Sequence, residues 1–123
     1  MNKPNEIYGF TYKSLNNVHG DLITVKNKSD HAGNPAGGEV LGTGISITWQ
    51  NGPVDRKAGG VATGAFVEDV IEACIIRLEY YQNSRFRCDE NEETISSLKH
   101  ARDTLFQRRK DRQARGVEGK HEK

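Results

Sequence analysis

Glycine and proline are concentrated in the first half of this chain, and this asymmetry constrains the fold more than any other feature. Eleven of the 13 glycines lie within residues 1–64, all three prolines lie at or before Pro53, and residues 65–115 contain neither. Both residue types mark turns and interrupt regular elements. We therefore expect short strands joined by turns before about residue 64 and uninterrupted helices after it.

The first half contains three runs of aromatic and β-branched residues, which are strand candidates: 7–12, 22–25 and 39–49. In the third run Ile45, Ile47 and Trp49 alternate with polar residues, and this period of two is typical of a strand with one covered face. Residues 30–38 and 51–53 are rich in Gly, Pro and Asn, so we expect a loop and a turn there. These features predict a small sheet.

The second half repeats apolar residues three and four positions apart: Phe66, Val67, Val70, Ile71, Cys74, Ile75 and Leu78. This spacing predicts an amphipathic helix over residues 65–82. Asp89 with Glu92 three positions later matches a capping box, which predicts the start of a second helix. Gly116 stands where a helix-terminating glycine belongs. The short connection over residues 83–88 favours an antiparallel hairpin.

The predicted fold class is α+β, with a small N-terminal antiparallel β-sheet followed by a C-terminal antiparallel helical hairpin. The length of 123 residues suits a single domain, with a β-rich part (1–63), the hairpin (64–116) and a polar tail (117–123). Only 34% of the residues are hydrophobic, and the mean hydropathy is −0.77. A short chain with so lean a core is marginally stable alone, so we expect an oligomer that buries more apolar surface.

Several function classes are disfavoured. The chain has no apolar run of the ~20 residues that a membrane helix needs, and no secretory signal is visible at its start. The two cysteines fit neither a zinc motif nor a disulfide framework, and the four histidines are scattered. Nucleophile-elbow, phosphate-loop and dinucleotide motifs are missing as well. We expect a cytoplasmic binding protein rather than an enzyme, with no catalytic residues, metal or cofactor.

Charge is distributed unevenly although the net charge is only +1. Residues 105–123 contain seven Lys or Arg and three Asp or Glu, whereas residues 65–82 contain four acids and one arginine. A near-neutral total argues against general binding to polyanions, which depends on neutralising many phosphates. The polarised distribution is compatible with a local site for a small anion.

The second helix has an apolar seam that changes into arginines. The seam begins with Ile95, Leu98, Ala101 and Leu105 and continues by heptads to Arg108, Arg112 and Arg115. These three arginines lie i, i+4 and i+7 and therefore share a narrow arc. Arginine suits phosphate because its planar fork donates two parallel hydrogen bonds. The alternative is a solvated helix end, where the helix dipole favours basic residues. The pattern leaves both interpretations open.

Other candidate ligand contacts lie outside this seam. Tyr81 and Phe86 offer a stacking surface for a purine ring, worth roughly 1–3 kcal/mol per base in nucleic-acid systems, or simply pack at the mouth of the hairpin. Asn91 either reads a base edge or caps the second helix. Arg56 and Lys57, in the loop after the third strand candidate, either close over a phosphate or are solvated.

Four segments carry a family resemblance: 44–53 (GISITWQNGP), 64–73 (GAFVEDVIEA), 86–91 (FRCDEN) and 112–119 (RQARGVEG). Together they resemble the Thoeris anti-defence proteins, which are phage-encoded sponges; the related anti-CBASS sponges share the helical hairpin. The resemblance covers about residues 39–121. The runs RGVEG and FxCxEN are its most specific parts, and the first 38 residues carry no matching motif.

This resemblance implies dimers that assemble into hexamers in the cytoplasm of the infected bacterial host. It implies binding, without cleavage, of cyclic ADP-ribose isomers, chiefly the glycocyclic forms that bacterial TIR-domain enzymes make. Some members also hold cyclic di- or trinucleotides at a separate site. The ligand contacts of the family correspond here to Tyr81 or Phe86, Asn91, Arg108 and Arg112, with Arg115 as a further candidate. We expect no membrane or nucleic-acid partner.

The sequence departs from the family pattern at two positions. Arg109 and Lys120 stand where the family has threonine, and both add charge near the end of the second helix. Arg109 therefore joins Arg56 as an additional candidate contact. The alternative to a sponge is a helical-hairpin module of a phage that binds nucleic acid or docks on an acidic protein.

Overall fold

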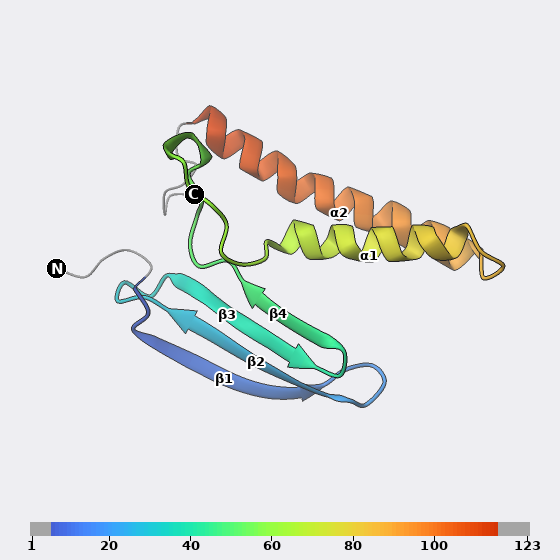
Figure 1. Ribbon diagram of the computed structural model, residues 1–123, viewed down its shortest axis with the longest axis horizontal. Helices are drawn as coiled ribbons and strands as arrows, with labels where there is room; N and C mark the ends of the chain where they lie inside the picture. The colour runs from blue at the N-terminus through green and yellow to red at the C-terminus, as the bar shows by residue number, and fades with distance from the viewer. Residues whose placement is uncertain (1–5, 116–123) are drawn as a thin grey trace. The chain divides into compact units, whose positions relative to one another are not determined.

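The computed structural model describes residues 6–115. They form two compact units, a β unit that ends at Ala65 and a helical unit that begins at Phe66 (Figure 1). An antiparallel sheet precedes two helices, which confirms the predicted α+β class. The boundary lies two residues after the predicted one. The predicted stop at Gly116 and the polar tail 117–123 lie outside the described residues.

The sheet has four antiparallel strands in the order β1-β2-β3-β4: β1 (Gly9–Asn16), β2 (Leu22–Ser29), β3 (Pro35–Gly42) and β4 (Ile45–Trp49). The prediction of a single strand over residues 39–49 is wrong, because a turn at Thr43 and Gly44 divides it into β3 and β4. Gly44 has a φ of +73°, a conformation that glycine adopts without steric cost. β3 also begins inside the predicted loop, at Pro35.

The strand register sorts the side chains of the sheet onto two different faces. Val25, Val40 and Ile47 lie side by side across β2, β3 and β4. Two residues further along the strands, Ile23 and Ile45 lie on either side of Gly42. Paired residues share a face, so these side chains form one apolar face, as the alternation in β4 predicts. On the opposite face the ammonium of Lys26 lies 4.3 Å from the centre of the Phe10 ring, and Lys28 pairs with Glu39 at 3.4 Å.

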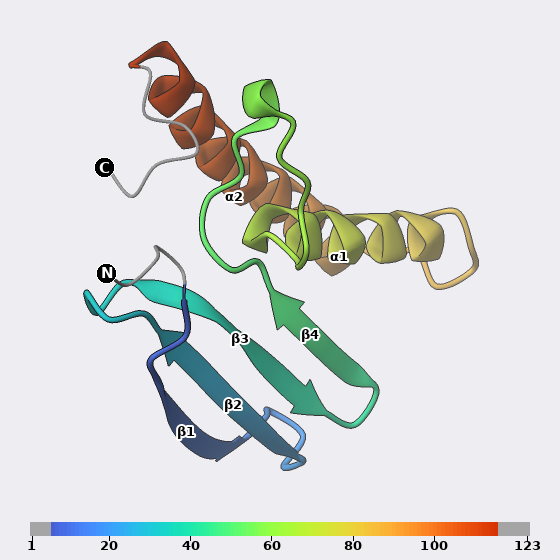
Figure 2. The same ribbon diagram turned by 60° about the vertical axis from the view of Figure 1, so that its left-hand side comes forward.

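The hairpin consists of α1 (Val67–Gln82) and α2 (Asp89–Ala114), which run antiparallel along one another (Figures 1 and 2). Ile75 and Ile95, with 1% and 5% of their surface exposed, are its most buried apolar residues. At a rise of 1.5 Å per residue α2 is about 39 Å long and α1 about 24 Å. No helix between residues 6 and 115 combines the length and the apolar character needed to cross a membrane.

The start of α2 is fixed by a side chain of the preceding helix. The Oε1 atom of Gln82 accepts a hydrogen bond from the Cys88 amide at 3.0 Å, and its Nε2 donates to the Cys88 carbonyl at 3.1 Å. The same Nε2 donates to Glu92 at 3.2 Å. The expected capping box between Asp89 and Glu92 is therefore wrong: Asp89 is the first helical residue, and Glu92 is engaged by Gln82.

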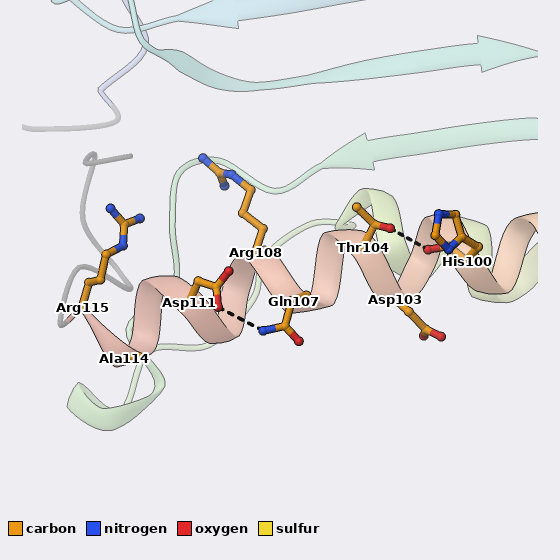
Figure 3. Close-up of a pocket in the computed structure, with 8 residues that line it drawn as sticks. All are labelled: His100, Asp103, Thr104, Gln107, Arg108, Asp111, Ala114 and Arg115. Atoms are coloured by element: carbon orange, nitrogen blue, oxygen red, sulfur yellow. Dashed lines mark hydrogen bonds between the residues drawn. The ribbon is translucent and has the colours of Figure 1, made fainter.

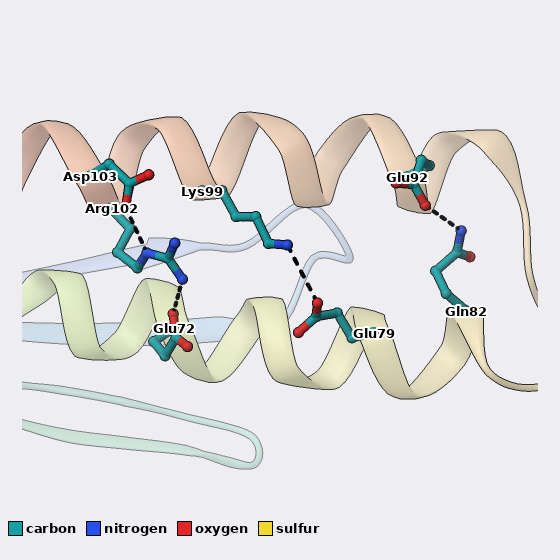
Figure 4. Close-up of polar contacts among 7 residues, drawn as sticks. All are labelled: Glu72, Glu79, Gln82, Glu92, Lys99, Arg102 and Asp103. Atoms are coloured by element: carbon teal, nitrogen blue, oxygen red, sulfur yellow. Dashed lines mark hydrogen bonds and ion pairs between the residues drawn. The ribbon is translucent and has the colours of Figure 1, made fainter.

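A row of polar contacts joins the two helices along one side (Figure 4). Arg102 donates to Glu72 at 2.6 Å and to its neighbour Asp103 at 3.0 Å. The hydrogen bond to Glu72, followed by the one to Asp103, raises the pKa of Arg102 above its usual value. Lys99 pairs with Glu79 at 3.5 Å. The acidic α1 and the more basic α2 thus meet in a defined register.

Candidate ligand-binding site

An open concave surface lies near the C-terminal end of α2 (Figure 3). Its volume is about 940 Å³, and the described residues that line it all come from α2: His100, Asp103, Thr104, Gln107, Arg108, Asp111, Ala114 and Arg115. The guanidinium groups of Arg108 and Arg115 extend from the same side of the helix (Figure 3). Gln107 donates to Asp111 at 3.0 Å. A single helix cannot enclose a ligand, so the described residues of this surface present two cations along one wall only.

The predicted row of three arginines is split between two faces of α2. The half-buried residues of α2 that follow Ile95 are Leu98, Lys99, Ala101, Arg102, Leu105, Arg109 and Arg112. Arg108 and Arg115 are exposed on the neighbouring face. The prediction that Arg108, Arg112 and Arg115 continue the seam is therefore wrong for Arg108 and Arg115. Only Arg112, whose Nε atom is shielded from solvent, remains on it.

Arg109 is engaged by the first turn of α1. Its Nη2 lies 3.1 Å from Glu68 Oε1, and its guanidinium lies 4.3 Å from the centre of the Phe66 ring. The side chains of Arg109 and Glu68 are 31% and 19% exposed, so the pair is partly desolvated. Arg109 thus ties α2 to the start of α1, whereas its expected contact with a ligand stays a prediction.

The connection between the helices is held by a dense set of local hydrogen bonds. Ser84 Oγ donates to the Tyr81 carbonyl at 2.6 Å and accepts from the Phe86 amide at 3.1 Å. Asn91 Nδ2 donates to the Phe86 carbonyl at 3.4 Å. These bonds hold the backbone of Phe86 in place while 60% of its surface remains exposed, with the Arg85 guanidinium 4.8 Å from its ring centre. Asn91 and Phe86, both candidates from the sequence, are therefore neighbours.

Arg77 is a residue that our sequence reasoning missed. Its Nη2 donates to the hydroxyl of Tyr81 at 3.2 Å, and its guanidinium lies 4.8 Å from the Tyr81 ring centre and 5.2 Å from that of Tyr80. The i, i+4 spacing of Arg77 and Tyr81 on one helix was the available signal. The half-buried Tyr81 is thus already stacked, whereas Tyr80 and Phe86 expose most of their surface.

The structure therefore places the candidate residues in separate groups. Phe86 and Asn91 lie at the turn end of the hairpin (residues 77–91), and Arg108 and Arg115 lie at its open end (residues 66–69 and 105–115). Asn91 and Arg108 are 17 positions apart on one helix, or about 26 Å at 1.5 Å per residue. Arg56 lies in the β unit, exposed on the short helix η1 (Arg56–Ala58). Among residues 6–115, no group of three His, Cys, Asp or Glu is arranged to hold a metal ion.

Comparison with known proteins identifies a relative. No family model matches the sequence. A curated protein named "Thoeris anti-defense 1", from Bacillus phage SBSphiJ7, is 44% identical to this chain over 85 residues. The chain belongs to the phage Thoeris anti-defence family. The matched region is 69% of this chain and 58% of the relative, so the chain spans somewhat more than half the length of this Thoeris anti-defence protein.

Proposed function

We propose that this protein is a phage anti-defence sponge that binds cyclic ADP-ribose isomers made by bacterial TIR enzymes and holds them without cleaving them. The observation that carries the proposal is the match to a protein named for action against Thoeris. Each bound signal molecule is withheld from the host effector that it would otherwise activate. Such a role requires affinity and a sufficient number of sites rather than turnover, and its place of action is the cytoplasm of the infected cell.

The two ends of the hairpin supply the two kinds of contact that such a ligand needs. Its phosphates suit the exposed guanidinium groups of Arg108 and Arg115, with Arg112 beside them on the seam. Its adenine suits the exposed ring of Phe86 and the amide of Asn91. Nanomolar binding corresponds to about −12 kcal/mol, whereas a charge-assisted hydrogen bond contributes roughly 1.5–3 kcal/mol. Arginines or aromatic contacts alone are therefore too few for tight binding.

A site with both kinds of contact requires two chains. The separation of about 26 Å between Asn91 and Arg108 along α2 exceeds what one cyclic nucleotide bridges. A second hairpin brings its turn end to the open end of the first and closes the wall that α2 lacks. The hairpin also exposes large apolar side chains that a partner chain can cover: Val67, Ile76, Tyr80, Phe86 and Phe106. Dimers, and hexamers built from them, fit this requirement.

The decisive experiment is to mix the purified protein with cyclic ADP-ribose isomers, desalt it, denature it by heat and analyse the released nucleotide by mass spectrometry. Intact ligand in near-stoichiometric amount supports the sponge and identifies the preferred isomer. An opened product contradicts it and makes the protein an enzyme. If nothing is retained, repeating the assay with cyclic di- and trinucleotides distinguishes a wrong ligand from a wrong function.

Salt dependence distinguishes the sponge from a nucleic-acid-binding hairpin. Binding to a polyanion falls steeply and linearly when the logarithm of affinity is plotted against that of salt concentration, because many phosphates are neutralised. A cyclic ADP-ribose isomer brings only two phosphates. We expect a shallow slope for the nucleotide and no tight binding to duplex or single-stranded DNA at physiological salt.

A further inference from the structure

The loop after β4, residues 51–64, is closed at its base by one side chain. The Oε1 atom of Gln50 accepts hydrogen bonds from the amides of Thr63 at 2.7 Å and Gly64 at 3.0 Å. The backbone amide of Gln50 donates to the Ala65 carbonyl at 2.9 Å, and the backbone amide of Ala65 donates to the Thr48 carbonyl at 2.7 Å. The half-buried Gln50 therefore joins the two ends of a 14-residue segment.

Close packing of the backbone reinforces this closure. A Cβ atom on Gly64 would lie 2.6 Å from the carbonyl carbon and oxygen of Trp49, so only glycine fits where the returning chain lies against the end of β4. Trp49 and Ala65 form an isolated parallel bridge at the same point. Loops with such close ends are compact units and frequently functional.

The tip of the loop is closed a second time by Asp55. Its carboxylate accepts from the amides of Lys57 at 3.1 Å and Ala58 at 3.2 Å, and its carbonyl accepts from the Gly60 amide at 2.8 Å. This arrangement folds η1 and leaves the side chains of Arg56 and Lys57 exposed. Neither cation pairs with an acid within the described part of the chain, so a well-defined loop presents two adjacent positive charges.

We infer that Gln50 is a positioning residue that holds residues 51–64 so that Arg56 and Lys57 bind a phosphate group of a nucleotide. This inference rests on the proposed function and adds a residue that touches no ligand itself. A prefolded loop does not have to lose its conformational freedom when the ligand arrives, and this raises affinity without a new contact. Loss of the Gln50 hydrogen bonds therefore weakens binding while both cations remain in the chain.

The test compares the parent with three variants. Gln50→Met keeps the size of the side chain but removes the amide acceptor. Thr63→Ala is the matched control, because it alters the same loop but keeps the Thr63 amide that Gln50 binds. The double variant Arg56→Gln/Lys57→Gln removes the cations and leaves the closure in place. Hydrogen exchange at the Thr63 and Gly64 amides reports the closure, and exchange in α1 and α2 reports whether the rest of the protein is folded.

Two binding readouts accompany exchange. The first is the dissociation rate of the cyclic ADP-ribose isomer retained by the parent. The second is the NMR shift of the Arg56 and Lys57 amides on titration with inorganic pyrophosphate. We expect Gln50→Met to speed exchange at residues 63 and 64, to speed ligand dissociation roughly tenfold and to weaken the pyrophosphate shifts. Thr63→Ala matches the parent. The double variant loses the pyrophosphate shifts and releases the nucleotide faster, with normal exchange.

Several results would overturn the inference. It fails if Gln50→Met leaves exchange at residues 63 and 64 unchanged, or if exchange rises while dissociation and the pyrophosphate shifts stay at parent values. It also fails if the double variant binds like the parent. If the parent retains no cyclic nucleotide, the proposed function fails, and the pyrophosphate titration alone then decides whether Gln50 positions an anion-binding loop.

Discussion

The two ends of the helical hairpin are held by contacts of different range. At the turn end Ser84, Asn91 and Gln82 bond to partners no more than ten positions away. At the open end Arg109 reaches Glu68 across 41 positions. Just beyond that end Arg102 reaches Glu72 across 30 positions. The geometry of the turn end is thus encoded locally, whereas that of the open end depends on how the two helices align.

The two ends also differ in chemistry. The turn end presents aromatic rings and an amide over a backbone fixed by hydrogen bonds. The open end presents guanidinium groups on α2, which is longer than α1. The proposed ligand, which has an adenine ring and phosphates, would use both ends. Substitutions at one end or the other therefore separate their contributions.

Replacing Arg112 at the open end has the largest expected effect. Arg112→Ala removes a charge-assisted contact of roughly 1.5–3 kcal/mol, so we expect ligand affinity to fall about 10- to 100-fold with assembly unchanged. Calorimetry measures the affinity and light scattering the assembly. Lys110→Ala is the control, because this exposed cation lies over Phe106 at 4.9 Å. Parent-like affinity of Arg112→Ala would show that Arg112 does not contact the ligand.

Mixing two defective chains tests whether the ends of different chains cooperate. Asn91→Ala damages the turn end and Arg112→Ala the open end, so homo-oligomers of either variant bind weakly. In mixed dimers one of two sites combines the intact ends, and we expect about half of the parental capacity in that fraction. Co-expression with two affinity tags isolates the mixed dimers for the retention assay. No recovery of capacity would indicate that both ends serve the same chain.

Removing the Gln82 side chain tests the turn end alone. Gln82→Leu loses the two hydrogen bonds to Cys88 and the one to Glu92. The half-buried backbone amide and carbonyl of Cys88 then lack their hydrogen bonds to Gln82. We expect a loss of about 1–3 kcal/mol in the free energy of unfolding, measured by urea denaturation. Gln107→Leu, which loses one bond on an exposed helix face, should change stability by less than about 0.5 kcal/mol.

The smallest expected effect concerns the pair that joins the helices at the open end. Glu68→Gln, Arg109→Gln and the double variant form a cycle that isolates the coupling between these side chains. Because both are partly exposed, we expect a coupling energy of about 1 kcal/mol that declines as salt is added. A coupling of zero would mean that stacking on Phe66 alone holds Arg109.

Prediction from sequence succeeded where neighbours along the chain decide the structure. The repeat from Phe66 to Leu78 gave the first helix within two residues of its ends, and the alternation of Ile45, Ile47 and Trp49 placed them on one face. It failed where two propensities compete. Residues 39–49 are rich enough in β-branched residues to hide the turn at Gly44, and the capping residues at 89 and 92 match a pattern that Gln82 supersedes.

The candidate site shows the same division. Phe86 and Asn91 lie five positions apart across a short connection, and the structure joins them. The sequence of α2 alone did not show which arginines face α1. An apolar spacing of three and four residues is compatible with two neighbouring stripes on the surface of the helix. Contact with Glu68 and Phe66 selects the stripe that carries Arg109. The Gln50 closure was equally invisible, because its partners are backbone amides 13 and 14 positions away.

Composition, periodicity and motifs were enough to predict the order of sheet and hairpin, the helix lengths and the family, because they are properties of adjacent residues. The tertiary structure decided which arginines are exposed, which acids engage the others and how the loop at residues 51–64 is closed. A hydrogen bond or an ion pair forms only between atoms within about 3–4 Å in space, and only the folded chain brings distant residues to that distance.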